Sequence, residues 1–137
     1  MLKYFRVKDA DVLPDISKFK PYKAVLVLEA QFNTEVQASI STWLVSSGCL
    51  YMMAWGVECS SWDDSVDFAN LELFDYGEIP DEDFVMTTWH VSEPLEEVFF
   101  FAKNCAIHSA VNIENVLILH FGTKYGESEL LGKYELA

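Results

Sequence analysis

Residues 24–28 read AVLVL, an unbroken run of β-branched residues, leucine and alanine. Such a run is typical of a strand whose two faces are both buried, as in a parallel sheet. Three further apolar runs of strand length follow along the chain: CLYMMAW at residues 49–55, FVMTTW at 84–89 and VLILHF at 116–121. The four runs predict the core strands of one sheet, spanning residues 23–29, 49–55, 84–90 and 116–121.

A helical pattern separates each predicted strand from the next. Thr34 and Gln37 have the spacing of a capping box, Ser60 or Ser61 can cap a second helix, and Ser92 a third. Strands that alternate with helices pair in parallel, through crossovers that are almost always right-handed. The sequence therefore predicts an α/β fold, a three-layer sandwich with a mainly parallel sheet. Numbering the four core strands along the chain, we expect the spatial order 2-1-3-4.

The sequence predicts the structure of the two chain ends less fully than that of the core strands. Residues 2–7 are interpreted as an extra edge strand, and residues 125–137 as a short helix or a tail. The chain has 137 residues, the usual size of one domain, and contains no linker, repeat or low-complexity block. We expect residues 1–137 to form a single domain.

The charge is strongly and unevenly acidic. The chain has 9 Lys and Arg residues against 22 Asp and Glu, a formal net charge of −13, and no Lys or Arg lies between residues 24 and 102. Nucleic acids and anionic membranes are bound through basic side chains, so both are predicted to be excluded as partners. Solubility and a charged docking face remain two alternative explanations of the acidic excess.

Cysteine usage and the amino terminus favour the cytoplasm. Three cysteines, an odd number, agree with a reducing compartment, and the start MLKYFRVKDAD has no apolar signal-like segment. The apolar runs are far shorter than the ~20 residues of a membrane-spanning helix.

No GxGxxG, GxxxxGK[ST], CxxC or HExxH pattern occurs. We therefore predict no cofactor and no metal.

Ligands of open parallel sheets bind beyond the carboxyl ends of the strands. That rule selects Glu29, Cys59, His90 and His120. Cys59 precedes a predicted helix, whose N-terminus favours a thiolate, so Cys59, His90 and His120 are the candidate catalytic residues. Against this, the acids near Cys59 disfavour a thiolate and free cysteines are commonly core residues. We expect Cys59 to be no more reactive than the other cysteines.

A second set of side chains has the composition of a protein-binding surface. Tryptophans surrounded by carboxylates are typical of a contact with a basic partner. The candidate binding residues are Trp62, Asp63, Asp64, Asp67, Trp89, His90 and Glu29. Asp63 and Asp64 also have a simpler interpretation, since acids in the first turn of a helix are favoured by its dipole.

Two stretches of the chain resemble a known family. CSSWDDSVDFAN at residues 59–70 and MTTWH at residues 86–90 are similar to the signature of a small bacterial domain family of unknown function. The resemblance implies a bacterial source but no activity. From size, acidity and the lack of a catalytic motif, we expect an acidic protein-binding module. Its most concrete form is an immunity or antitoxin-type inhibitor of a basic toxin or effector. The alternatives are a small enzyme or ligand-binding domain using Cys59, His90 and His120, and an accessory module that forms homo-oligomers.

Overall fold

The computed structural model describes all residues 1–137 and contains one sheet in which every neighbouring pair of strands is parallel. The strands are β1 (Leu2–Arg6), β2 (Tyr22–Leu28), β3 (Cys49–Gly56), β4 (Met86–His90) and β5 (Asn115–Phe121). The predicted α/β class, the parallel pairing and the extra edge strand are confirmed.

Four α-helices follow or connect the strands: α1 (Thr34–Ser46), α2 (Trp62–Leu73), α3 (Leu95–Asn104) and α4 (Glu127–Leu136). Three single turns of 3₁₀ helix, η1 (Ser17–Phe19), η2 (Cys59–Ser61) and η3 (Asp81–Asp83), lie in the connections. The N-cap of α1 is Asn33, whose side chain accepts a hydrogen bond from the Val36 N–H, so the helix is capped one residue earlier than predicted. None of the helices is long and apolar enough to span a membrane.

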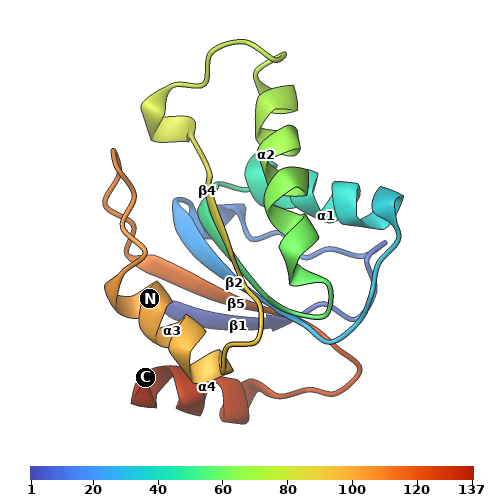
Figure 1. The fold of residues 1–137 in the computed structure, drawn as a ribbon, viewed down its shortest axis with the longest axis vertical. Coiled ribbons are helices and arrows are strands. Elements are labelled where there is room, and N and C mark those ends of the chain that lie inside the picture. The colour runs from blue at the N-terminus through green and yellow to red at the C-terminus, as the bar shows by residue number, and fades with distance from the viewer.

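Helices cover both faces of the sheet and form the predicted three layers. α1 and α2 pack on one face, and α3 and α4 on the other (Figure 1). The central strand β2 shows why both faces are apolar: Leu26 and Leu28 belong to the core under α1 and α2, whereas Val25 and Val27 belong to the core under α3 and α4. Burying one such side chain stabilises the fold by about 1.5–3 kcal/mol.

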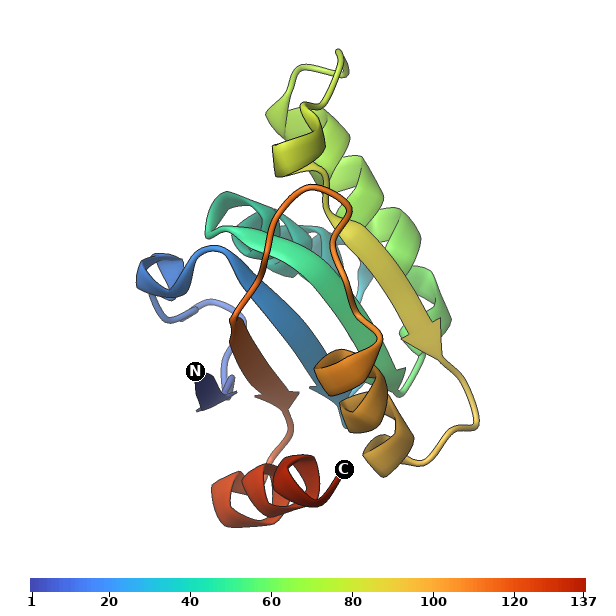
Figure 2. The ribbon, with the colours of Figure 1, turned by 90° about the vertical axis from the view of Figure 1, so that its left-hand side faces the viewer.

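The order of the strands differs from the prediction. The sheet has the order β1-β5-β2-β3-β4, in which the four core strands are arranged 3-2-1-4 instead of 2-1-3-4. The reason lies in the helices. α1 and α2 lie on the same face, so two right-handed crossovers step outward in the same direction and place β4 beyond β3. α3 lies on the opposite face and returns the chain to β5, beside β2 (Figure 2).

Candidate functional site

At β2 and β5 the chain leaves two neighbouring strands toward opposite faces of the sheet, so this pair forms a switch point. β2 and β5 are adjacent and parallel; the chain passes from β2 to α1 on one face and from β5 to α4 on the other. Crevices of this kind are where ligands of open α/β sheets bind. Glu29, directly after β2, and His120, near the end of β5, meet at this switch point.

His120 is the centre of a hydrogen-bonded cluster that joins three segments of the chain. Its ring is buried, at 5% exposure; Nδ1 lies 2.6 Å from the Tyr4 hydroxyl, and Nε2 contacts Glu29 Oε1. The Tyr4 oxygen also accepts a hydrogen bond from the Gly126 N–H, at 3.0 Å. The simplest arrangement that satisfies every group has the Tyr4 O–H donating to Nδ1 and Nε2–H donating to Glu29, which is the neutral histidine.

Gly122 allows the two side chains of this cluster to meet. A Cβ atom at this position would overlap Glu29 Oε1 and would lie 2.8 Å from His120 Nε2. A larger residue here would have to displace Glu29 or His120, so glycine favours their contact. Sequence reasoning selected Glu29 and His120 but missed Tyr4 and Gly122. The role of Tyr4 depends on β1 lying next to β5 and that of Gly122 on β2 lying next to β5, and no pattern in the sequence specifies either pairing.

His90 lies in a separate environment at the end of β4. Its Nδ1 is 2.9 Å from Glu93 Oε2 and its Nε2 is 2.9 Å from Thr88 Oγ1, and its ring packs against Phe101. Trp55 donates from its indole N–H to the Glu93 carbonyl, at 2.7 Å. Both ring nitrogens of His90 are thus occupied by local partners that hold the turn into α3.

The register of the sheet separates the two histidines. His90 pairs with Trp55, Trp55 with Val27, and Val27 with His120. Three strand spacings of about 4.8 Å place them roughly 14 Å apart. They do not share a site.

Cys59 is brought together with neither histidine. It is buried, at 3% exposure, in the core under α1 and α2, whereas His90 packs against α3 and His120 against Tyr4 on the opposite face. The arrangement of Cys59, His90 and His120 that the sequence suggested for catalysis is therefore not formed. Two features of the prediction explain the difference. It had a different strand order, and it placed all strand ends on one rim without assigning each residue to a face of the sheet.

The candidate binding residues divide into buried and exposed members. Trp62 is buried at 2% exposure between Phe32 and Phe121, so the structure places it in the core and not on a surface. Trp89 remains 47% exposed on β4, at the edge of the sheet.

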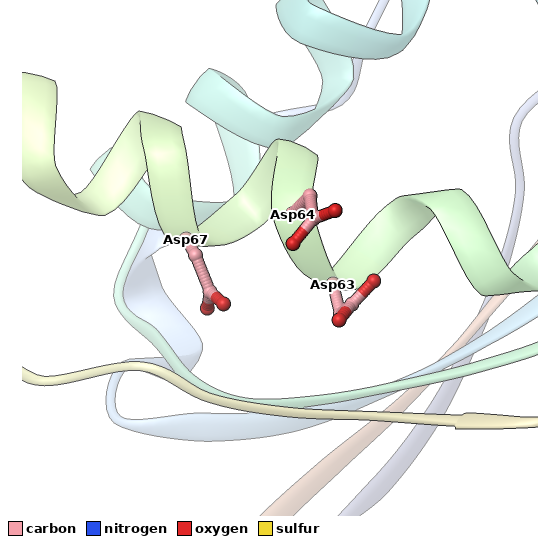
Figure 3. A group of neighbouring side chains, drawn as sticks. All are labelled: Asp63, Asp64 and Asp67. Atoms are coloured by element: carbon pink, nitrogen blue, oxygen red, sulfur yellow. The ribbon is translucent and has the colours of Figure 1, made fainter.

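Asp63, Asp64 and Asp67 form an acidic group on α2 (Figure 3). One carboxylate oxygen from each lies within 4.8 Å of the others, a spacing that an oxygen-binding cation would accept. Burial raises the pKa of Asp67, and the charges of Asp63 and Asp64 add to that rise, while a hydrogen bond from Thr87 Oγ1, at 3.1 Å, opposes it. Helix geometry alone brings residues four apart onto one face, so the spacing by itself identifies no metal.

Fold and site together define a class, a three-layer α/β domain with a five-stranded parallel sheet and a Tyr-His-Glu cluster at its switch point. Within that class, the chain belongs to the family described as "Domain of unknown function (DUF7684)", whose model matches residues 2–137. This confirms membership of a family of unknown function, as the resemblance implied. No curated protein matches the chain, and no solved structure matches it either.

Proposed function

We propose that the protein is an acidic protein-binding module that covers a basic site on a partner protein in the bacterial cytoplasm. Its most specific form is an immunity or antitoxin-type inhibitor of a toxin or effector. One observation carries the proposal: α2, the segment after it and β4 lie together along the β4 edge of the sheet and contain no Lys or Arg (Figure 1); this region is called here the acidic end (residues 62–90). Its acids are Asp63, Asp64, Asp67, Glu72, Asp75, Glu78, Asp81, Glu82 and Asp83.

Local contacts hold the acidic end together as one surface. The buried side chain of Asn70 donates to the Asp83 carbonyl and accepts from the Val85 N–H, and Thr87 donates to Asp67. α2, η3 and β4 are therefore fixed to one another, so the segments that carry these carboxylates keep constant relative positions. A rigid acidic surface attracts a basic partner over a long range without a large ordering cost.

Aromatic side chains are exposed among these carboxylates. Phe68, Tyr76, Phe84 and Trp89 are each between 47% and 59% exposed, and the Phe68 and Tyr76 rings lie 5.7 Å apart. Aromatic residues dominate the energy of protein interfaces when they become buried by a partner. β4 also pairs only with β3, so its outer edge has main-chain groups that an added strand of the partner can bind. Trp89 is the expected anchor, because it lies on this edge.

The test is partner capture followed by kinetics with two matched double variants. Asp63→Lys with Asp64→Lys reverses charge on the acidic end. Glu114→Lys with Glu135→Lys makes the same charge change on exposed residues elsewhere, neither of which has a side-chain hydrogen bond. A partner that fits the proposal is basic, is lost from the first variant and is retained by the second. Co-expression of the protein with that partner should also suppress the partner's activity.

Binding kinetics distinguish the long-range electrostatic attraction of the acidic end from the contact that Trp89 makes in the complex. Association of the wild-type complex should slow as salt rises from about 0.01 M to about 0.15 M, over which the Debye length falls from about 30 Å to about 8 Å. Asp63→Lys with Asp64→Lys should remove most of that dependence, whereas Trp89→Ala should chiefly speed dissociation. Two results would contradict the proposal: an association rate that does not change with salt, or a partner that still binds the variant Asp63→Lys with Asp64→Lys.

A further inference from the structure

A second feature of the switch point lies on the other side of Gly122 from the Glu29 and His120 pair. The carboxyl ends of β1, β2 and β5 enclose a cavity of about 320 Å³, lined in part by Arg6, Lys8, Phe32, Phe121 and Gly122. Its volume lies at the lower end of the range of ligand-binding pockets. The cavity has the position in which ligands of parallel sheets are bound.

The lining is basic in a strongly acidic protein. Arg6, the only arginine of the chain, and Lys8 contribute two positive charges, and no residue that lines the cavity is Asp or Glu. Neither cation forms an ion pair with any carboxylate of the chain. The Arg6 guanidinium donates to the carbonyls of Gly122 and Thr123, at 3.1 and 2.5 Å, which fixes it while leaving three of its five N–H groups for a ligand.

Backbone donors surround the same cavity. The N–H groups of Ala30, Phe32, Gly122 and Thr123 have no acceptor within the protein. Cations and free N–H groups both favour an anion.

The remaining walls are apolar. Phe32 and Phe121 pack edge to face, with ring centroids 5.7 Å apart, and Val7 and Ala10 complete the lining near the end of β1. A free inorganic anion would leave this surface uncovered. A ligand with an apolar body attached to its anionic group would bury it.

From these observations we infer that the cavity at the carboxyl ends of β1, β2 and β5 binds a small organic anion, with its charged group on Arg6 and Lys8 and its apolar body against the partly exposed Phe32, Ala10 and Ala30. The anionic group is a carboxylate or a phosphate monoester. This binding site is distinct from the acidic end and does not depend on the proposed function.

The experiment titrates the whole protein with benzoate, phenyl phosphate, inorganic phosphate and benzyl alcohol, followed by calorimetry and by amide shifts in NMR spectra. Benzoate or phenyl phosphate should bind saturably and shift the amides of Ala30, Phe32 and Gly122. The tighter of the two identifies the charged group. Inorganic phosphate should bind more weakly than phenyl phosphate, and benzyl alcohol should not bind.

Variants test whether the anion binds in this cavity. Lys8→Glu should weaken binding by about tenfold or more, the loss that accompanies one charge-assisted hydrogen bond. Lys20→Glu makes the same charge change before β2, at the amino end of the sheet, and should leave affinity unchanged. Ala30→Leu should block the cavity without changing charge, and circular dichroism should show that each variant is folded. No saturable binding of either organic anion, equal binding of inorganic and phenyl phosphate, or equal affinity in Lys8→Glu and Lys20→Glu would overturn the inference.

Discussion

Single residues at the switch point decide how β1 and α4 attach to the rest of the sheet. Tyr4 on β1 and Gly126 before α4 are joined to His120 through one hydroxyl group. A buried polar group that loses its partner costs far more than the net gain of an average hydrogen bond. The cluster is therefore a stability element in addition to any role in ligand binding.

Tyr4→Phe tests the strength of this cluster. The change leaves His120 Nδ1 without its hydroxyl partner and the Gly126 N–H without an acceptor. We expect the free energy of unfolding to fall by about 1–3 kcal/mol, the usual cost of unsatisfied buried groups. The matched control is Tyr76→Phe, since Tyr76 is 59% exposed, and it should change stability by less than about 0.5 kcal/mol. Urea denaturation of both variants measures the difference; equal values would contradict the prediction.

The cysteines provide a second prediction at the residue scale. Cys49 and Cys59 are buried and Cys105 is exposed, and burial raises the pKa of Cys49 to about 12. Because the thiolate is the species that reacts, iodoacetamide should modify Cys105 first, and Cys49 and Cys59 only as the protein opens. Peptide mapping by mass spectrometry over time gives the order. Preferential modification of Cys59 in the folded protein would instead revive the hypothesis that it is a nucleophile.

Asp67 links stability to pH. Its pKa is raised above the ordinary value of 3.8, chiefly by burial. The folded state therefore holds this proton to higher pH than the unfolded state does, so the contribution of Asp67 to stability falls as pH rises through and above that ordinary value. Asp67→Asn should raise the free energy of unfolding at neutral pH and weaken its fall with pH, because the amide oxygen still accepts from Thr87. Asp81→Asn, the same change on exposed η3, should have little effect on denaturation curves collected across this pH range.

At the scale of the element, the connection between α2 and β4 depends on one side chain. Asn70 is 1% exposed and bonds both the Asp83 carbonyl and the Val85 N–H. Those two bonds bring η3 against α2 and so build the acidic end. The amphipathic pattern of α2 accounts for its packing on the sheet, but the position of η3 depends on this contact.

Asn70→Ala should release that connection. We expect a loss of about 1–3 kcal/mol in the free energy of unfolding, chiefly because the buried Val85 N–H is left without an acceptor. Hydrogen exchange of the amides in residues 81–85 should accelerate more than that of β2. Asn104→Ala is the control, because the exposed Asn104 side chain bonds only the Phe100 carbonyl within α3. Uniform acceleration over all elements would show that Asn70 supports the fold as a whole and not this connection.

At the scale of the whole molecule, the net charge of −13 opposes compactness. Screening should relieve this repulsion, so the melting temperature should rise as salt increases from about 0.01 M to about 0.15 M, where the Debye length is about 8 Å. Asp63→Lys with Asp64→Lys, which relieves repulsion at the acidic end, should show a smaller rise. Calorimetric scans at matched pH measure both. A melting temperature that falls with added salt would mean that attractive pairs outweigh the repulsion.

The sequence by itself determined the α/β class and the parallel pairing, because apolar runs such as residues 24–28 can be satisfied only by burial on both faces. It also identified Glu29 and His120 as candidate site residues, because each lies at the carboxyl end of an apolar run that marks a strand. The strand order, the pairing of β1 with β5 and the face of each residue were decided only by tertiary structure. Whether a helix packs on one face or the other changes which strands become neighbours, and amphipathic helices with similar apolar stripes do not encode that choice locally. Cys59, Trp62 and Tyr4 therefore acquired their positions, in the core or at the switch point, from contacts between segments far apart along the chain.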